Sequence, residues 1–367
     1  MEVKVINYAY TNSLKNLKES KNRYYFILSL FIIFLFISII CAVSIGAFKV
    51  DIKTVYEVLA YKIFGIGSKN AEAITQTSAY NVIWSIRFPR VLLGVIVGAG
   101  LALCGSVMQA CVQNPLAEPF ILGISSGASL GATFSIMLGV GALPLLAVSG
   151  VAFWSFLGAM AASFMVLRLA SINGKSTTTK LILAGTIISS LCTAISNFII
   201  SVASDAQGMQ SVKFWTMGSL ASAKWEYIIT PLLGTIICCL YFLTQTRHLN
   251  TMLVGEEAAI TLGMDLNKKR KTYMILISIL TGVLVASCGV IGFVGLVIPH
   301  IVRSLVGADH KKLLPICTLA GSIFLVWTDA IARSIIPNAE VSIGIITSLI
   351  GAPFFAYILI KKSNSFR

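Results

Sequence analysis

Few side chains in this sequence are placed to perform chemistry, and the first to consider is Lys175. The string Gly174-Lys175-Ser176 resembles the end of the phosphate-binding pattern GxxxxGK[ST], in which backbone N–H groups and the lysine hold the phosphates of a nucleotide. That pattern needs a glycine at position 169, where the chain has Leu169, and no strand is expected before it. We therefore interpret residues 174–176 as a loop between membrane spans and expect no ATP site in this chain.

Charged residues inside the apolar segments would indicate an ion-coupled carrier, because charge in a bilayer is costly and is kept for a function. The apolar segments contain almost none. Asp329 and Arg333 have the i, i+4 spacing of an ion pair on one helix face, and we expect His300, after Pro299, to pack rather than relay protons. With neither an ATP site nor a coupling carboxylate, the energy for transport must come from another chain.

The cysteines predict neither a metal centre nor disulfide bonds. They lie in or beside apolar segments without a CxxC pair, and the three histidines are not clustered. We expect small, buried apolar side chains and no metal or cofactor. The cysteines are Cys41, Cys104, Cys111, Cys192, Cys238, Cys239, Cys288 and Cys317.

The composition places most of the chain in a lipid bilayer. Hydrophobic residues make up 57% of the 367 residues and charged residues 11%, whereas a soluble domain has about 25% charged residues. A span needs ~20 apolar residues to cross a hydrocarbon core of ~30 Å, and the apolar runs predict an all-α, polytopic membrane protein with ten spans. The predicted spans are residues 25–47, 91–112, 120–139, 146–168, 180–203, 227–246, 272–288, 291–306, 313–332 and 341–360.

Three segments organise the chain around these spans. Residues 1–23 would be a basic cytoplasmic segment ahead of an uncleaved first span, since that apolar run is too long for a secretion signal. Residues 24–361 would be the ten-helix transmembrane domain, with a turn near residues 139–144 between the third and fourth spans. Residues 362–367 would form a cytoplasmic tail.

Lysine and arginine set the expected orientation. With both termini on the cytoplasmic side, most of the 28 basic residues fall in cytoplasmic segments, as the positive-inside rule requires. The outer loop, residues 49–90, breaks the trend, but it is long and acidic residues partly offset its charge. We attribute the net charge of +14 mainly to topology and expect no nucleic-acid partner, because the basic residues are scattered.

The longest predicted cytoplasmic segment between spans, residues 250–266, has the features of a docking element. Its sequence NTMLVGEEAAITLGMDL predicts a short helix from Glu256 to Leu262, with acidic residues in the first turn and Gly263 as C-cap. Two short helices lying along the membrane face would fit this segment. On this loop alone, an amphipathic surface helix without a partner is an equal alternative.

Three stretches together resemble a known family. They are RFPRVLLGVIVGAGLALCGSVMQACVQNPLAEPFILGISSG at residues 87–127, GVIGFVGLVIPHIVRSLVGADHKKLLP at 289–315, and DAIAR at 329–333 followed by VSIGIITSLIGAPFFAYIL at 341–359. In residue types and spacing the chain is similar, from about Trp84 to Lys361, to the FecCD permease subunits of ABC importers for ferric siderophores, haem and vitamin B12. The resemblance implies the type II importer permease fold and leaves residues 1–23 and 49–83 unassigned.

The resemblance also implies a gate. Asn114-Pro115-Leu116 breaks a helix at a predicted membrane boundary, which is tolerated where the backbone is buried or lines a water-filled cavity. The family places Asn114 and Leu116 at a cytoplasmic constriction, with Thr178 and Thr179 in corresponding places. The fifth span would line the pathway with the weakly polar residues Thr186, Ser189, Ser190, Thr193, Ser196 and Asn197.

Two surfaces for partners are implied in the same way. The pattern of Gly255, Glu256, Ala259, Leu262 and Gly263 matches the segment that couples the family to an ATPase subunit. Arg87, Arg90 and Arg333 correspond to arginines that dock a substrate-binding protein, and a guanidinium suits this role because it pairs bidentately with carboxylates. Alternatively, Arg87 and Arg90 anchor a span at the lipid headgroups, and Arg333 pairs with Asp329.

The sequence thus predicts a non-enzymatic permease of the plasma membrane. It would pair with itself or a paralogue, with two ATPase subunits and with an extracytoplasmic substrate-binding protein, and would import a ferric siderophore. Haem and cobalamin are alternative cargoes on the same fold. A secondary carrier or channel acting alone is a rival of another class, and an integral-membrane enzyme would need a catalytic constellation that we do not find in the sequence.

Overall fold

Helices account for all the regular structure of the described residues. The computed structural model describes residues 2–46, 50–65, 77–141, 150–172, 177–336 and 339–364. The helices are α1 (Glu2–Ser44), α2 (Ile52–Phe64), α4 (Ser78–Asn81), the π-helical turn η2 (Val82–Arg87), α5 (Phe88–Val112), the 3-10 turn η3 (Pro119–Leu122), α6 (Ile124–Leu138), α7 (Gly150–Ala170), α8 (Thr178–Ala203), α9 (Ala206–Thr216), α10 (Trp225–Thr244), α11 (Thr246–Val254), α12 (Glu256–Thr261), α13 (Leu266–Cys288), α14 (Val294–Val306), α15 (His310–Ala332) and α16 (Ile343–Asn364).

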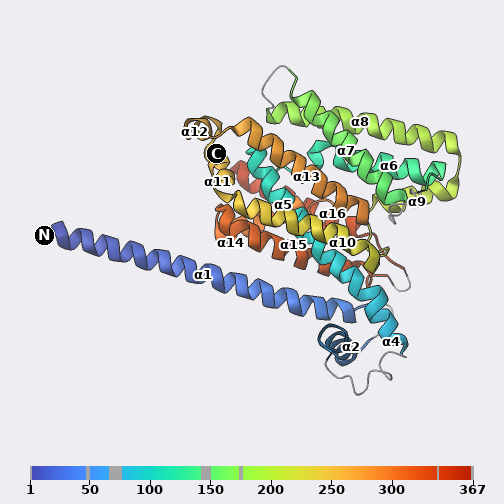
Figure 1. Cartoon of the computed structure of the whole chain (residues 1–367), viewed down its shortest axis with the longest axis horizontal. Helices are drawn as coiled ribbons and strands as arrows, with labels where there is room; N and C mark the ends of the chain where they lie inside the picture. Colours follow the sequence, from blue (N-terminus) through green and yellow to red (C-terminus); the bar gives the residue numbers. More distant parts are fainter. Residues whose placement is uncertain are drawn as a thin grey trace.

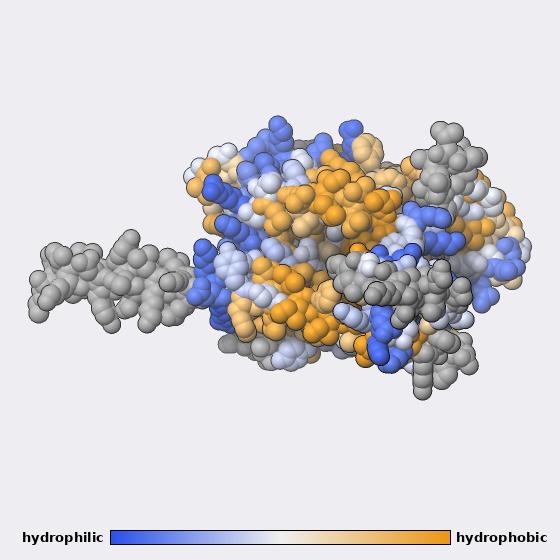
Figure 2. Space-filling model, turned by 60° about the horizontal axis from the view of Figure 1, so that its bottom comes forward, coloured by the Kyte–Doolittle hydropathy of each residue, from blue (hydrophilic) through white to orange (hydrophobic). Residues whose placement is uncertain are grey.

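The ten predicted spans are confirmed as helices. In the described part of the chain, seven helical segments are long and apolar enough to cross a membrane, and α6, α14 and most of α16 are shorter apolar helices. Each overlaps a predicted span. Figure 2 shows a broad apolar band across the visible face, with hydrophilic residues toward both ends. The predicted turn at 139–144 lies largely outside the described residues.

One continuous helix, α1, spans both the predicted N-terminal segment and the first predicted span. No proline or glycine occurs between residues 2 and 44 to end the helix. Its N-terminal half extends beyond the bundle, and its C-terminal half packs along α15 (Figure 1).

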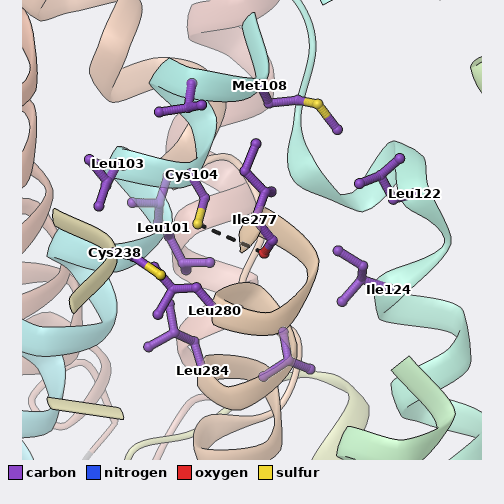
Figure 3. Packing of buried hydrophobic residues seen from close by; sticks show 14 of the residues in the cluster. Leu101, Leu103, Cys104, Met108, Leu122, Ile124, Cys238, Ile277, Leu280 and Leu284 are labelled. Carbon is purple, nitrogen blue, oxygen red and sulfur yellow. Dashed lines mark hydrogen bonds between the residues drawn. The ribbon is translucent and has the colours of Figure 1, made fainter. Parts of the chain in front are cut away.

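At the centre of the bundle lies α5, which packs against α10, α13, α14 and α15. Of the most apolar window in residues 78–112, 83% is buried, compared with 17% for α1. Leu101 and Cys104 of α5 face Ile277 and Leu280 of α13, and the Cys104 thiol lies 4.0 Å from the Ile277 carbonyl oxygen (Figure 3). Hence α5 is the element that the other helices enclose.

Small residues let these helices approach closely. A Cβ atom on Gly98 of α5 would overlap the backbone of Gly321 in α15, and one on Gly127 of α6 would overlap Gly158 in α7. Close backbone packing of this kind supports helix association in membranes, where lipid provides no hydrophobic drive. Gly98 and Gly127 therefore lie where two helices pack backbone to backbone.

The two ends of the bundle differ (Figure 1). The C-terminus of α5 lies at the same end as α11 and α12, which we call the α12 end. The N-terminal end of α5 lies with α2, α4 and the last turn of α15, which we call the α2 end.

Candidate functional site

The chain changes direction after the last turn of α5, as predicted. Gln113 ends the helix in the left-handed region, with φ 54° and ψ 33°. The Leu116 backbone N–H donates to the Asn114 side-chain oxygen at 2.9 Å, forming a turn, and Pro115 cannot continue a helix. The predicted gate residues Asn114 and Leu116 therefore lie on a hydrogen-bonded turn at the α12 end.

Three neighbouring elements bind the end of α5, where carbonyl groups lack partners within the helix. Thr178 Oγ1 donates to the Val112 carbonyl at 3.0 Å. Arg270 Nε donates to the Cys111 carbonyl at 2.9 Å. The Gln113 side chain in turn donates to the Met252 carbonyl of α11 at 2.7 Å. Three consecutive residues of α5 thus contact the starts of α8 and α13 and the helix α11.

Of the two predicted gate threonines, Thr178 is half-buried against α5 and Thr179 is exposed. Leu116 lies on the opposite side of the turn, in a small apolar groove. The groove is lined by Pro115 and Leu116 of the turn, by Leu296, Val297 and His300 of α14, and by Phe354, Phe355 and Ile358 of α16. His300 therefore borders the predicted gate, packed among apolar side chains as expected.

The segment 250–266 forms two short helices, α11 and α12, as predicted. Gly255 between them has φ 125° and Gly263 after α12 has φ 80°, both in the range that favours glycine. The Met264 N–H donates to the carbonyl of buried Ala259 at 3.1 Å, which caps the C-terminus of α12. The glycines of the predicted pattern thus shape the turns, and Ala259 is the buried residue of α12.

Other side chains of this helix pair point away from the bundle. Leu262 is 71% exposed and Val254 68%, with Leu253 and Ile260 also exposed. Glu256 is partly exposed, and its carboxylate lies 3.6 Å from the guanidinium of buried Arg270. The α12 end therefore presents apolar side chains beside an acidic residue that contacts the interior.

Asn250, in the middle of α11, is fixed to the start of α15. Its side-chain oxygen accepts a hydrogen bond from the His310 backbone N–H at 2.9 Å and lies 2.8 Å from His310 Nδ1. Its amide donates to Asp309 Oδ1 at 2.7 Å. Because Asp309 also caps α15 by accepting from the Lys311 N–H, α11 and α15 share one hydrogen-bonded cluster.

A half-buried carboxylate, Glu118, follows the gate turn. It accepts a hydrogen bond of 2.8 Å from the backbone N–H of Phe293, at the start of α14. Burial raises the pKa of Glu118 to about 7, and the hydrogen bond from Phe293 opposes this rise. Phe293 has φ 69°, and its ring lies against Gly351 of α16.

Sequence reasoning missed Gln113, Glu118, Asn250 and Arg270. Arg270 belongs to the basic run at 268–271, which looks like a topological signal. The burial of Arg270 could have been predicted from helical spacing, because position 270 falls on the same face as the buried residues Tyr273, Met274 and Ile277. For Gln113, Glu118 and Asn250 the partners are distant in sequence, so no local signal identifies them.

At the α2 end, the three arginines predicted to dock a partner are buried and bonded within the chain. Arg87 donates to the Val43 and Ser44 carbonyls of α1, each at 3.0 Å. Arg90 and Arg333 each lie 2.9 Å from the buried carboxylate of Asp329. The predicted ion pair between Asp329 and Arg333 is thus confirmed, and Arg90 joins it.

Further bonds extend this cluster. Arg90 Nη1 also binds Glu340, whose side chain is 44% exposed, and Arg333 donates to the Ile45 carbonyl at 2.8 Å and the Ala42 carbonyl at 3.1 Å. The arginines therefore join α1, α5 and α15. Their present bonds do not test the predicted docking role, which stays a prediction.

Ten apolar helical segments in the described residues, a central enclosed helix and a bonded turn at one of its ends are typical of one class of protein, the polytopic transport permease of a membrane. The model of the FecCD transport family matches residues 32–361. The chain belongs to this family and is an ABC importer permease.

Relatives match over most of their length. The chain is 39% identical over 341 residues to the uncharacterised ABC transporter permease protein YvrB of Bacillus subtilis (strain 168), covering 91% of this chain and 93% of that one. It is 37% identical over 311 residues to the hemin transport system permease protein HmuU of Yersinia pestis, covering 82% and 92%. A solved transporter described as metal-chelate type, in an inward-facing conformation, has a TM-score of 0.77 at 31% identity and covers 91% of this chain and 99% of its own.

Proposed function

We propose that this chain pairs with a second permease subunit, itself or a paralogue, to enclose a pathway for iron chelates. Two ATPase subunits would dock at the α12 end and supply the energy. The α12 end would then face the cytoplasm, with both termini on that side of the plasma membrane.

The observation that carries this proposal is a polar stripe on the exposed side of α8. Thr186, Ser190, Thr193 and Asn197 recur every three or four residues and are all exposed, so they follow one face of the helix. Polar side chains in a span normally face a bundle interior or a water-filled cavity, because contact with lipid is unfavourable. In the described part of the chain nothing covers this stripe, so a second permease subunit opposite α8 would enclose a polar path.

The exposed apolar side chains of α11 and α12 support docking of an ATPase subunit. Leu262 and Val254 project from a short helix pair at the end of the bundle that carries the gate turn. An apolar surface of this kind in an otherwise polar setting is typical of an interaction site. Gly255, Glu256, Ala259, Leu262 and Gly263 are thus the proposed coupling residues, and Asn114, Leu116, Thr178 and Thr179 are the proposed gate.

A substrate-binding protein would dock at the α2 end, as the resemblance implies. Arg87, Arg90 and Arg333 remain the proposed docking residues. Because each already binds groups of this chain, docking would require them to exchange an internal partner for a carboxylate of the binding protein.

Iron chelates, with a ferric siderophore first, are the proposed cargo. The weakly polar stripe of α8 suits a large chelate that passes without tight binding. The hemin permease among the relatives keeps haem as an alternative, and cobalamin is the other. In each case the binding protein would select the cargo.

Reconstitution in proteoliposomes tests the proposal. With ATPase subunits and the binding protein, uptake of a ferric siderophore, haem or cobalamin should require ATP, and the permease alone should take up none of them. The variant Leu262→Glu should weaken association with the ATPase, whereas Ile172→Glu, at another exposed apolar residue, should not. Uptake by the permease alone would instead establish a secondary carrier or channel.

A further inference from the structure

We infer that Arg270 is the positioning residue that carries movement of the coupling helix α12 to the gate turn after α5. The inference rests on the proposed function, since it assumes that an ATPase docks on α12. It concerns a buried side chain that is not itself among the proposed gate, coupling or binding-protein docking residues.

Arg270 touches both elements with one guanidinium group. Its Nε donates to the Cys111 carbonyl in the last turn of α5 at 2.9 Å, and its Nη2 lies 3.6 Å from Glu256 Oε2 in α12. A guanidinium is planar and its donors point in fixed directions, so it relates its partners geometrically in a way that a lysine ammonium does not. A displacement of Glu256 therefore acts directly on the end of α5.

The hydrogen bond between Arg270 and Cys111 lies close to the gate turn, so a small movement there would reach the gate. Cys111 is three residues before Asn114, and the intervening residues are also bonded, Val112 to Thr178 and Gln113 to Met252. The gate turn, the start of α8 and the coupling segment are consequently joined through the last turn of α5. Among the described residues at this junction, Arg270 forms a hydrogen bond with α5 and an ion pair with α12.

A purely structural role for Arg270 makes a different prediction. Cations near a helix C-terminus stabilise it by interacting with the terminal carbonyl groups, and burial of Arg270 could serve only this purpose. In that case a lysine would largely suffice, and loss of the guanidinium would lower stability without separating ATP hydrolysis from transport. A transmitting role instead requires both contacts at once.

The experiment uses the complete complex in proteoliposomes and compares four variants. Arg270→Lys keeps the charge and loses the fixed geometry, Arg270→Gln removes both, and Glu256→Gln removes the charge on the partner. Lys271→Gln is the matched control, since it removes one positive charge from the adjacent exposed residue. ATP hydrolysis and uptake are measured together, and a Leu116→Cys background reports the gate through labelling by a thiol reagent with and without ATP.

The expected result is a split between hydrolysis and transport. Arg270→Lys and Arg270→Gln should hydrolyse ATP but import about tenfold less substrate per ATP, the size of effect seen for residues that couple two sites. Labelling at position 116 should no longer respond to ATP, and Glu256→Gln should show the same change to a smaller degree. Lys271→Gln should behave as the parent.

Two outcomes would overturn the inference. One is coupled uptake within about twofold of the parent in Arg270→Lys and Arg270→Gln, an effect too small for a coupling residue. The other is a parallel loss of hydrolysis and uptake with an intact labelling response. If Arg270→Gln fails to assemble, Arg270→Lys and Glu256→Gln decide the question. Failure of the parent complex to import with ATP would reject the proposed function itself, which is a separate result.

Discussion

Glu118 and Phe293, which are 175 positions apart in the sequence, are joined by a hydrogen bond of 2.8 Å from the phenylalanine N–H to the carboxylate. The bond connects the segment after the gate turn to the start of α14. It also retains Phe293 at φ 69°, a conformation that costs an aromatic residue on the order of 1–2 kcal/mol. Replacing the carboxylate therefore removes a hydrogen bond that helps to offset the cost of the backbone conformation at Phe293.

We expect Glu118→Ala to lower the free energy of unfolding by about 1–3 kcal/mol, because it leaves a buried N–H without an acceptor. Glu118→Gln retains an acceptor and should lose much less. Thermal denaturation in detergent measures both. In a Phe293→Gly background, where positive φ is not strained, loss of the hydrogen bond releases no strain, so the effect of Glu118→Ala should be at least as large, and a clearly smaller effect would contradict this account.

The cluster of Asn250, Asp309 and His310 predicts how α11 is anchored. Asn250→Asp replaces a donor to Asp309 by a second carboxylate, at a site where the present contact is 2.7 Å. Like charges at this distance repel, so α11 should separate from α15, and amide hydrogen exchange over residues 246–261 should become faster. Asn267→Asp, at an exposed position of α13, makes the same chemical change and should leave that exchange rate as it was.

The arginine cluster at the α2 end predicts unequal effects of two carboxyl groups. Asp329 is buried between Arg90 and Arg333, so Asp329→Asn should cost about 3–5 kcal/mol, the range for breaking a buried ion pair. Glu340 is partly exposed, and Glu340→Gln should cost at most about 1 kcal/mol. Melting temperatures of the two variants check this order, and equal losses would show that burial does not set the energetics here.

The same cluster decides how the docking prediction must be tested. Charge reversal at Arg87 and Arg90 should abolish association with a binding protein if these residues dock it. Because both side chains also bond within the chain, the melting temperature must be measured beside the association. Lost association at an unchanged melting temperature supports direct docking, whereas lost association with a lowered melting temperature reflects the broken cluster.

Local features of the sequence predicted a large part of the fold. The spans were predictable because each must bury an apolar segment of known length in the bilayer. The helix at 256–261 and the turn at Asn114 were predictable because glycine and proline act on their immediate neighbours. The long-range contacts were not, since the side chain of Arg270 could equally have been a surface cation, and Arg87 a headgroup anchor. The arginines show this limit best, as their charge is evident from sequence and their burial is not.

The enclosure of α5 has a consequence for how the protein senses its lipid. A helix surrounded by other helices need not match its apolar length to the hydrocarbon around the protein, whereas α1, which is mostly uncovered, must do so by tilting or by deforming the lipid. A thinner or thicker bilayer should therefore tilt the peripheral helices first, while the helix that ends at Val112 keeps its orientation.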